Sequence, residues 1–204
     1  MNLLKKSLAS IILVLTLLSI SAVVASAATH AVKNGDTLWR LAVAYEVGLS
    51  EIKEANPTIK NYDLIYPGQK INIPDTDQFV ASYEAEVVRL VNIERENRGL
   101  LPLKENWQLS RVARYKSDDM RSRKYFSHTS PTYGSPYAMI RNFGITYKTA
   151  GENIARGYTT PAAVVNGWMN SDGHRANILN ASYTEIGVGY VSDGNYWTQM
   201  FISK

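Results

Sequence analysis

Residues 167–179 read GWMNSDGHRANIL and join two predicted helices in the second half of the chain. The first of these helices is predicted to start at Thr160 as N-cap, with Pro161 in its first turn. The second is predicted to start near His174, where Asp172 is a candidate cap. A titratable ring therefore stands at a helix start, and the pattern alone is compatible with a ligand role or with helix capping.

Three further segments of the same half carry side chains of the catalytic or metal-binding type. FSHTSP contains His128, GENIA contains Glu152 and TEIGVGY contains Glu185. These residues are too far apart along the chain to share one helix or turn, so only the tertiary fold can bring them together. Spacing alone therefore leaves a metal site and separate structural roles both open.

The surrounding sequence predicts an α+β domain. Apolar residues at helical spacing predict a helix from Phe79 that ends at Gly99, and another from about residue 108 to 123. The last segment alternates between apolar and polar residues around an Asp-Gly pair at residues 193–194, which predicts a β-hairpin. Helices combined with such antiparallel strands favour a layered α+β domain.

The segment 29–74 predicts a smaller βααβ unit. A strand at His30–Val32 is followed by a turn and by a helix that Asp36 or Thr37 can cap. A second helix is predicted after Ser50, which can cap it, and this helix ends at an Asn-Pro pair. The alternating strand KINIP then closes the unit.

The first residues have the pattern of an export signal. Two lysines precede an apolar run over residues 8–20, and small residues end in an Ala-Ser-Ala exit at residues 25–27. A membrane anchor needs about 20 apolar residues, and serines interrupt a run that is already shorter. We expect a signal peptide over residues 1–27, cleaved after Ala27, so that the protein is secreted without a membrane anchor.

Composition narrows the class of protein. The chain of 204 residues has no cysteine and therefore no disulfide, so its domains depend on their cores or on a bound ligand. Its net charge of +4 is too small to indicate nucleic-acid binding. Export without cysteine favours an extracellular protein that is associated with a bacterial cell wall.

Residues 29–74 resemble a LysM domain. The signature VKNGDTLWRLA opens the segment and YPGQKINIP closes it, in the order that this family has. The resemblance implies binding of N-acetylglucosamine-containing glycans, in peptidoglycan or a chitin-like polymer, through two loops on one side of the unit. It assigns these contacts to Gly35, Asp36, Thr37, Asn61, Leu64, Ile65 and Tyr66. For Asp36 and Thr37, helix capping remains an alternative.

After a short linker over residues 75–79, residues 80–204 resemble the CAP superfamily of cysteine-rich secretory, antigen 5 and pathogenesis-related 1 proteins. The resemblance rests on FSHTSP, GENIA, GWMNSDGHRANIL and TEIGVGY, in this order. It implies an α-β-α sandwich with an antiparallel sheet and a central cavity able to hold a divalent metal ion. It places His128, Glu152 and His174 in that cavity as metal ligands, with Zn²⁺ or another divalent cation as the ion.

The fourth cavity position departs from the family pattern. Eukaryotic members carry a glutamate shortly after the tryptophan of the preceding helix, and Ser171 stands near that position here. Asp172 and Glu185 are the acidic alternatives, and we favour Glu185 as the cavity residue because it begins a strand. Carboxylates near the histidines would raise the pKa of both rings.

The combined interpretation is a secreted, wall-associated protein that binds peptidoglycan through LysM and presents a His/Glu cavity in its CAP domain. Binding without catalysis is favoured, because the sequence contains no G-x-S-x-G, H-E-x-x-H or cysteine nucleophile. Two alternatives stay open, namely a metal-dependent hydrolase of a wall component or peptide and a lipid-binding carrier. The CAP ligand is not identified by the sequence.

Overall fold

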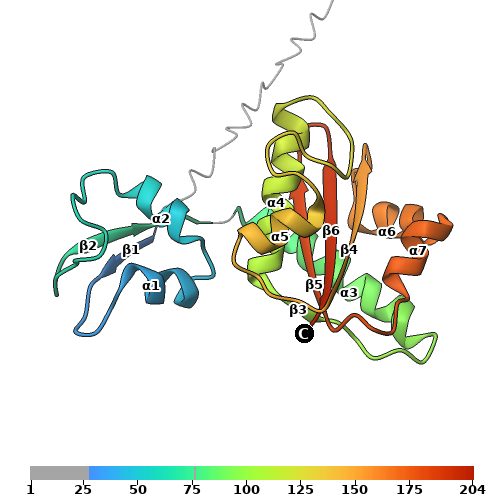
Figure 1. Cartoon of the computed structure of the whole chain (residues 1–204), viewed down its shortest axis with the longest axis horizontal. Coiled ribbons are helices and arrows are strands. Elements are labelled where there is room, and N and C mark those ends of the chain that lie inside the picture. The colour runs from blue at the N-terminus through green and yellow to red at the C-terminus, as the bar shows by residue number, and fades with distance from the viewer. Residues whose placement is uncertain (1–27, 76) are drawn as a thin grey trace, which may run out of the picture.

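The computed structural model describes residues 28–75 and 77–204, which form two units joined by a short connection (Figure 1). The predicted signal peptide over residues 1–27 lies outside the described residues. Of the described strands, two form the sheet of the smaller unit and four form the sheet of the larger one. Within the described ranges, no helix combines the length and apolar character that crossing a membrane requires.

The helices and strands form a βααβ unit followed by an α+β unit. In chain order they are β1 (Ala28–Ala31), α1 (Leu38–Ala44), α2 (Leu49–Ala55), β2 (Lys70–Ile73), α3 (Gln78–Glu96), β3 (Lys104–Glu105), α4 (Trp107–Ser122), α5 (Pro136–Asn142), β4 (Thr149–Arg156), α6 (Pro161–Met169), α7 (Asp172–Ile178), β5 (Glu185–Val191) and β6 (Tyr196–Ser203). The predicted α+β class is confirmed, and the smaller unit has the predicted order of elements.

The smaller unit has a core of its own between its two helices and its sheet. β1 and β2 pair antiparallel, with His30 opposite Ile71. Thr37, and not Asp36, is the N-cap of α1, because its hydroxyl accepts a hydrogen bond from the Arg40 amide at 3.1 Å. The core consists of buried aliphatic residues, which are Val32, Leu38, Leu41, Ala42, Val47, Ile52, Ile71 and Ile73.

The start of α2 differs from the prediction. The helix begins at Leu49 with Gly48 as N-cap, so Ser50 lies inside its first turn and does not cap it. The Ser50 hydroxyl instead donates to the Glu51 carboxylate at 2.7 Å. Both side chains also contact Arg111 of the larger unit. The first turn of α2 is therefore part of the contact between the two units.

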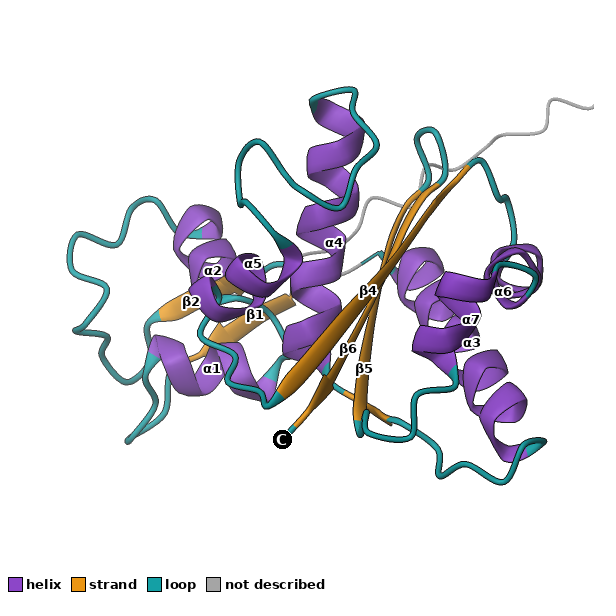
Figure 2. Ribbon diagram, turned by 45° about the vertical axis from the view of Figure 1, so that its right-hand side comes forward, coloured by secondary structure: helices purple, strands orange, loops and turns teal. Residues whose placement is uncertain are grey.

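The larger unit is an α-β-α sandwich with its sheet in the middle (Figure 2). The strand order is β3-β5-β6-β4, so β3 and β4 are the edges. β5, β6 and β4 pair antiparallel as predicted, whereas the two-residue strand β3 runs parallel to β5. Helices α4 and α5 lie on one face of the sheet, and α3, α6 and α7 lie on the other.

The GVG sequence within TEIGVGY allows α4 to lie directly on β5. A Cβ atom at Gly187 would overlap the backbone of Leu109, and a Cβ atom at Gly189 would overlap the backbone of Ala113. Glycine is required at both positions because the helix approaches closer than a side chain permits. This contact fixes α4, whose later turns hold the loop that carries His128.

The turn between α6 and α7 is only partly as predicted. Thr160 caps α6 and Pro161 occupies its first turn, as the sequence indicates. Ser171 is the N-cap of α7, although its side chain accepts no hydrogen bond there. Asp172 lies inside the first turn and pairs with Arg175 at 2.5 Å, so the prediction that Asp172 is the cap is wrong.

Candidate functional sites

A hollow of about 340 Å³ opens in the smaller unit. It brings together four of the predicted glycan contacts, which are Asp36, Thr37, Leu64 and Ile65. Its other lining residues are Leu38, Trp39, Leu49, Lys53, Tyr62 and Asp63. The hollow thus combines short polar side chains with aliphatic and aromatic ones, as small-molecule sites commonly do.

Three predicted glycan contacts do not line this hollow. The Gly35 carbonyl accepts a hydrogen bond from the Arg40 side chain at 2.6 Å, and the Asn61 side-chain oxygen accepts one from the Asp63 amide at 3.0 Å. The Tyr66 side chain is exposed, and its backbone amide donates to a glutamine side chain. Gly35 and Asn61 therefore shape the two loops and do not face the space between them.

The wall that α2 contributes to this hollow was not predicted. Leu49 and Lys53 are four residues apart on α2, and both line the hollow. Lys53 Nζ lies 5.3 Å from the centre of the Tyr62 ring. Side chains four residues apart share one face of a helix. The predicted second helix began after Ser50 and so left Leu49 outside it.

Asp36 is held in place by neighbours within its own unit. Its carboxylate accepts a hydrogen bond from the Lys33 amide at 2.7 Å and lies 2.8 Å from His30 Nε2. His30 Nδ1 in turn lies 2.9 Å from the Tyr45 hydroxyl. The Lys33 amide, and after it His30, lowers the pKa of Asp36, so the first loop carries a negative charge at neutral pH.

In the larger unit, His128 and Glu152 are in direct contact. His128 Nδ1 lies 2.7 Å from Glu152 Oε1, and both residues line a hollow of about 370 Å³. The His128 side chain is 54% exposed, whereas the Glu152 side chain is 2% exposed. Glu152 Oε2 is buried without a hydrogen-bond partner among the described residues. A half-exposed imidazole is therefore anchored by a buried carboxylate.

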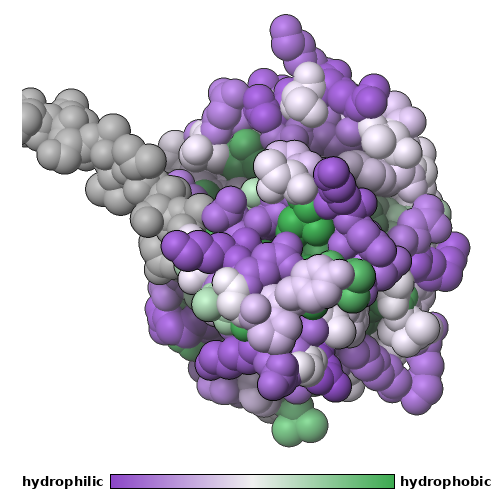
Figure 3. Space-filling view, turned by 90° about the vertical axis from the view of Figure 1, so that its left-hand side faces the viewer, coloured by the Kyte–Doolittle hydropathy of each residue, from purple (hydrophilic) through white to green (hydrophobic). Residues whose placement is uncertain are grey.

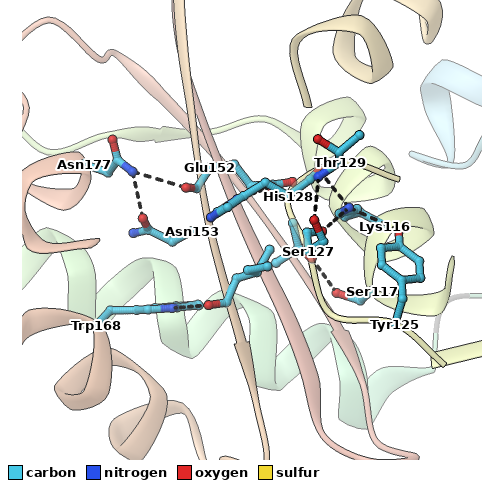
Figure 4. A network of polar contacts seen from close by, with 12 residues as sticks. Lys116, Ser117, Tyr125, Ser127, His128, Thr129, Glu152, Asn153, Trp168 and Asn177 are labelled. Atoms are coloured by element: carbon cyan, nitrogen blue, oxygen red, sulfur yellow. Dashed lines mark hydrogen bonds and ion pairs between the residues drawn. The ribbon is translucent and has the colours of Figure 1, made fainter. Parts of the chain in front are cut away.

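Helix α4 holds the loop that carries His128 (Figure 4). Lys116 is buried, and its Nζ donates to the carbonyls of Ser127 and His128 at 2.7 and 2.9 Å. Asp119, one turn further on, accepts a hydrogen bond from the Ser130 hydroxyl at 2.7 Å. Neither residue was predicted to have this role, although charged side chains at apolar positions of the helical period are a signal of it.

The surroundings of the pair raise the pKa of both partners, for different reasons. The hydrogen bond with Glu152 raises the pKa of His128, and burial only partly opposes this rise. Burial raises the pKa of Glu152, while His128 and Lys116 limit the rise. An imidazolium beside a carboxylate is thus the state that the two groups stabilise in each other. The expected rise of the histidine pKa is confirmed for His128.

His174 lies in a different hollow of about 290 Å³, whose lining includes Phe126, Tyr158 and Trp168. Its ring makes no hydrogen bond within the described part of the chain. Burial, and after it the charge of His128, lowers the pKa of His174. The expectation that carboxylates raise the pKa of both rings is therefore wrong for His174, which is half-buried without an acidic partner among the described residues.

Adjacent residues of β4 serve the two histidines. Glu152 contacts the ring of His128, and Asn153 donates to the backbone carbonyl of His174 at 3.1 Å. Successive side chains of a strand point to opposite faces. Asn177 donates to Asn153 at 2.8 Å, and Figure 4 shows these two amides together and away from the His128 loop. The GENIA sequence thus positions one ring directly and the other through its backbone.

Glu185 does not join the histidines. It accepts a hydrogen bond from the Asn106 side chain at 2.6 Å and has Lys204 Nζ at 3.5 Å. Its strand β5 is separated from β4 by β6, so the predicted place of Glu185 in the cavity is not observed. Glu185 instead holds the N-cap residue of α4. The Asp172 side chain is 94% exposed and pairs with Arg175, so it does not supply the fourth position either.

The predicted metal ligands do not form one cluster. In the described ranges, no group of three or more His, Asp or Glu side chains lies close enough together to hold an ion. An ion bound by both His128 Nδ1 and Glu152 Oε1 would have to replace their hydrogen bond, and His174 lines another hollow. The donor set therefore fits a His–Glu pair and does not fit a centre with three protein ligands.

Comparisons with known proteins match two families to the two units. The model of the cysteine-rich secretory protein family, CAP, matches residues 88–202, and the LysM domain model matches residues 30–74. These ranges correspond to the larger and the smaller unit of the structure.

Two similar proteins come from Bacillus subtilis. The uncharacterized protein YkwD of Bacillus subtilis (strain 168) is 59% identical over 125 residues, which is 61% of this chain and 49% of that protein. The uncharacterized membrane protein YlbC of the same strain is 36% identical over 169 residues, which is 78% of this chain and 48% of that protein. This chain therefore spans about half the length of these curated relatives.

A solved structure shows the same fold. The crystal structure of an extracellular protein containing a SCP domain, from Bacillus anthracis str. Ames, matches with a TM-score of 0.61 and 34% sequence identity. The match covers 68% of this chain and 47% of that chain.

Proposed function

The chain belongs to the cysteine-rich secretory protein (CAP) family and carries a LysM domain ahead of its CAP domain, and from this we propose that it binds cell-wall glycan. The proposed ligand of the LysM domain is an N-acetylglucosamine-containing glycan, as in peptidoglycan. The proposed location is outside the cell and attached to the wall. The Bacillus anthracis relative, itself described as extracellular, supports this location.

The observation that carries this proposal is the hollow where the two LysM loops meet. Asp36 and Thr37 offer polar groups to a sugar amide, and Leu64 and Ile65 offer an apolar surface to its methyl group. Trp39 is 55% exposed beside them. The LysM face in Figure 3 is mostly hydrophilic with small apolar patches, which suits a compact ligand of mixed polarity better than a wide apolar partner.

Sedimentation with purified wall sacculi tests the glycan site. Leu64→Glu places a charge in the hollow and is expected to reduce the bound fraction at least about tenfold, because the sugar would face an unpaired carboxylate. Leu101→Glu is the matched control, since this leucine is 83% exposed and lies in the CAP domain. Equal binding by the two variants would contradict the proposed site.

For the CAP domain we propose ligand binding without catalysis beside His128 and Glu152. The imidazolium form of His128 has its Nδ1–H directed at the carboxylate, which leaves Nε2–H as a donor for an acceptor oxygen of a ligand. The hollow also has Tyr137 and Tyr183 in its lining, and such rings give amphipathic contact surface.

Hydrolysis is the second candidate, and the His128–Glu152 contact favours it. A histidine oriented through Nδ1 by an acid can act as a general base toward water through Nε2. Reducing ends and free amines released from peptidoglycan measure this activity. Binding alone predicts no release by the unmodified protein. Hydrolysis predicts release that His128→Gln abolishes and His174→Gln retains.

A further inference from the structure

The LysM and CAP domains meet through the first turn of α2 and the first half of α4. Arg111 of the CAP domain donates to both carboxylate oxygens of Glu51, from Nε at 2.5 Å and from Nη2 at 2.8 Å. The same Nη2 donates to the Ser50 hydroxyl at 2.6 Å. A bidentate contact of this kind fixes the orientation of the guanidinium and the carboxylate as well as their distance.

Arg111 is aimed at the LysM domain by aromatic rings of its own domain. Its guanidinium carbon lies 5.3 Å from the centre of the Tyr115 ring and 5.2 Å from that of Phe143. Such cation–π contacts restrict the side chain before it meets its partner. The CAP domain therefore presents a pre-positioned guanidinium, which lowers the entropy cost of docking.

In the LysM domain the Arg111 guanidinium lies against Gly48, a residue without a side chain. A methyl group at Gly48 would overlap the Arg111 guanidinium and the Glu51 carboxylate. Gly48 has a φ of −76°, which any residue can adopt, so the backbone angle does not require glycine here. A side chain at Gly48 would therefore displace the Arg111 guanidinium and the Glu51 carboxylate from their present positions.

This ion pair differs from the ordinary surface pairs of the chain. The Arg111 and Glu51 side chains are 19% and 25% exposed, against 58% and 41% for the Arg89–Glu86 pair on α3. Burial alone would raise the pKa of Glu51, but hydrogen bonds from Arg111 and Ser50 outweigh it and lower the pKa. A shielded pair is less screened by solvent than an exposed one.

The rest of the contact is not tightly packed. A hollow of about 380 Å³ lies between the domains, lined by Tyr45, Val47 and Ile73 on the LysM side and by Trp107 on the CAP side. Because apolar groups do not fill this space, close packing does not hold the domains together there. Among the described residues, α4 is attached to the first turn of α2 by polar contacts, those of Arg111 with Glu51 and Ser50, and the Tyr115 hydroxyl lies beside the same two residues.

We infer that the LysM and CAP domains move as one rigid body, docked through Arg111 of α4 and the Gly48–Glu51 turn of α2. The same helix α2 supplies Leu49 and Lys53 to the proposed glycan hollow. Docking therefore fixes the direction of the glycan hollow relative to the hollow beside His128. This inference goes beyond the proposed function and does not depend on it.

Rotational diffusion of the two domains, from ¹⁵N NMR relaxation of the whole protein, tests this inference. One rigid body predicts the same rotational correlation time for LysM and CAP amides. Arg111→Glu should make the LysM amides tumble several-fold faster than the CAP amides. The exchanged pair, Arg111→Glu with Glu51→Arg, should restore common tumbling. Arg89→Glu is the matched control, since it makes the same charge change in a pair that does not reach the LysM domain.

A steric variant separates the contact from its charge. Gly48→Ala should release the LysM domain as Arg111→Glu does, without altering any charge, and the LysM amide spectrum reports that the domain stays folded. Independent tumbling in the unmodified protein would overturn the inference. Common tumbling that persists in Arg111→Glu, or an exchanged pair that fails to restore it, would overturn the role of this contact. Sedimentation with sacculi is measured separately, so failure of the glycan proposal leaves these results interpretable.

Discussion

His128 and His174 are the same residue type next to the same strand, yet their surroundings differ. His128 is half-exposed and paired with the Glu152 carboxylate, whereas the His174 ring is without a hydrogen-bond partner in the described part of the chain. The pKa of His128 is raised by its bond to Glu152, and the pKa of His174 is lowered by burial. The charge partner, and not the position in the family pattern, decides which ring is charged.

The residues that hold the two histidines in place also differ in charge. Charged groups of α4, Lys116 and Asp119, hold the loop of His128. Neutral amides hold the helix of His174, through Asn153 and Asn177. Burying a charged group costs more free energy than burying a neutral amide. Removing one partner of a buried charged group also leaves a larger unsatisfied desolvation cost. Removing a support on the His128 side should therefore have the larger effect.

The largest effect is expected for Lys116→Ala. The substitution deletes a buried side chain and leaves the carbonyls of Ser127 and His128 without their donor, so it should cost about 3 kcal/mol of unfolding free energy. Urea unfolding measures this loss. Lys104→Ala is the control, because Lys104 is exposed in the same domain. A loss no greater than that of the control would show that the buried ammonium does not support the loop.

A smaller effect is expected for Asn153→Ala on the other side of β4. It removes the donor to the His174 carbonyl and one partner of Asn177, which should cost about 2 kcal/mol. The exposed Asn166→Ala should change stability by less than about 0.5 kcal/mol. The His128 titration, followed by NMR, should stay as in the unmodified protein. A shift there would mean that the two sides are coupled and would break the comparison.

The pH dependence of stability should have opposite signs for the two rings. Because the folded pKa of His128 is raised above its ordinary value of 6.5, its stabilisation is fully present below that value and is lost as pH rises through the folded pKa. Because the folded pKa of His174 is lowered, protonation in the unfolded state opposes folding as pH falls below 6.5.

Two variants test these opposite pH dependences of stability between about pH 5 and pH 8. Relative to the unmodified protein, His128→Gln should lose more stability at the acidic end than at the basic end. His174→Gln should lose less at the acidic end. Urea unfolding at each pH measures both trends. Parallel trends would show that one electrostatic environment governs both rings.

The LysM site was largely predictable because it is built from local sequence. Thr37 caps α1 directly after the turn that the sequence indicates, and Leu64 and Ile65 follow in the second loop. The contribution of α2 to the hollow was not predicted, because the predicted helix began too late, after Ser50. Ser50 and Glu51 bind Arg111 of the CAP domain. A contact with another domain cannot be predicted from the local sequence pattern.

The CAP site was predictable only in part, because it depends on which strand each residue joins. The contact between His128 and Glu152 agrees with the proximity that the family resemblance implies. Glu185 was misplaced because its position at a strand start says nothing about strand order, and β6 lies between β5 and β4. Lys116 was missed because charge at a helix position usually indicates solvent, whereas this ammonium finds carbonyl acceptors.

The last and smallest effect concerns Zn²⁺, and it tests whether the two rings ever act together. In the described structure only His128 and Glu152 are in contact, so a divalent ion should bind weakly and through that pair. His128→Ala should lower the Zn²⁺ affinity about tenfold or more. His174→Ala should leave it nearly unchanged. Calorimetric titration measures both affinities.

Equal losses in the two variants would require His174 to turn out of its own hollow and toward His128. That movement would exchange a half-buried ring for a metal-bound one, and the His174 NMR signals would then shift on Zn²⁺ addition together with those of His128. Shifts confined to His128 would instead mean that the two rings stay chemically separate with the ion present. Zn²⁺ binding would then compete with the hydrogen bond to Glu152 and weaken as His128 is protonated.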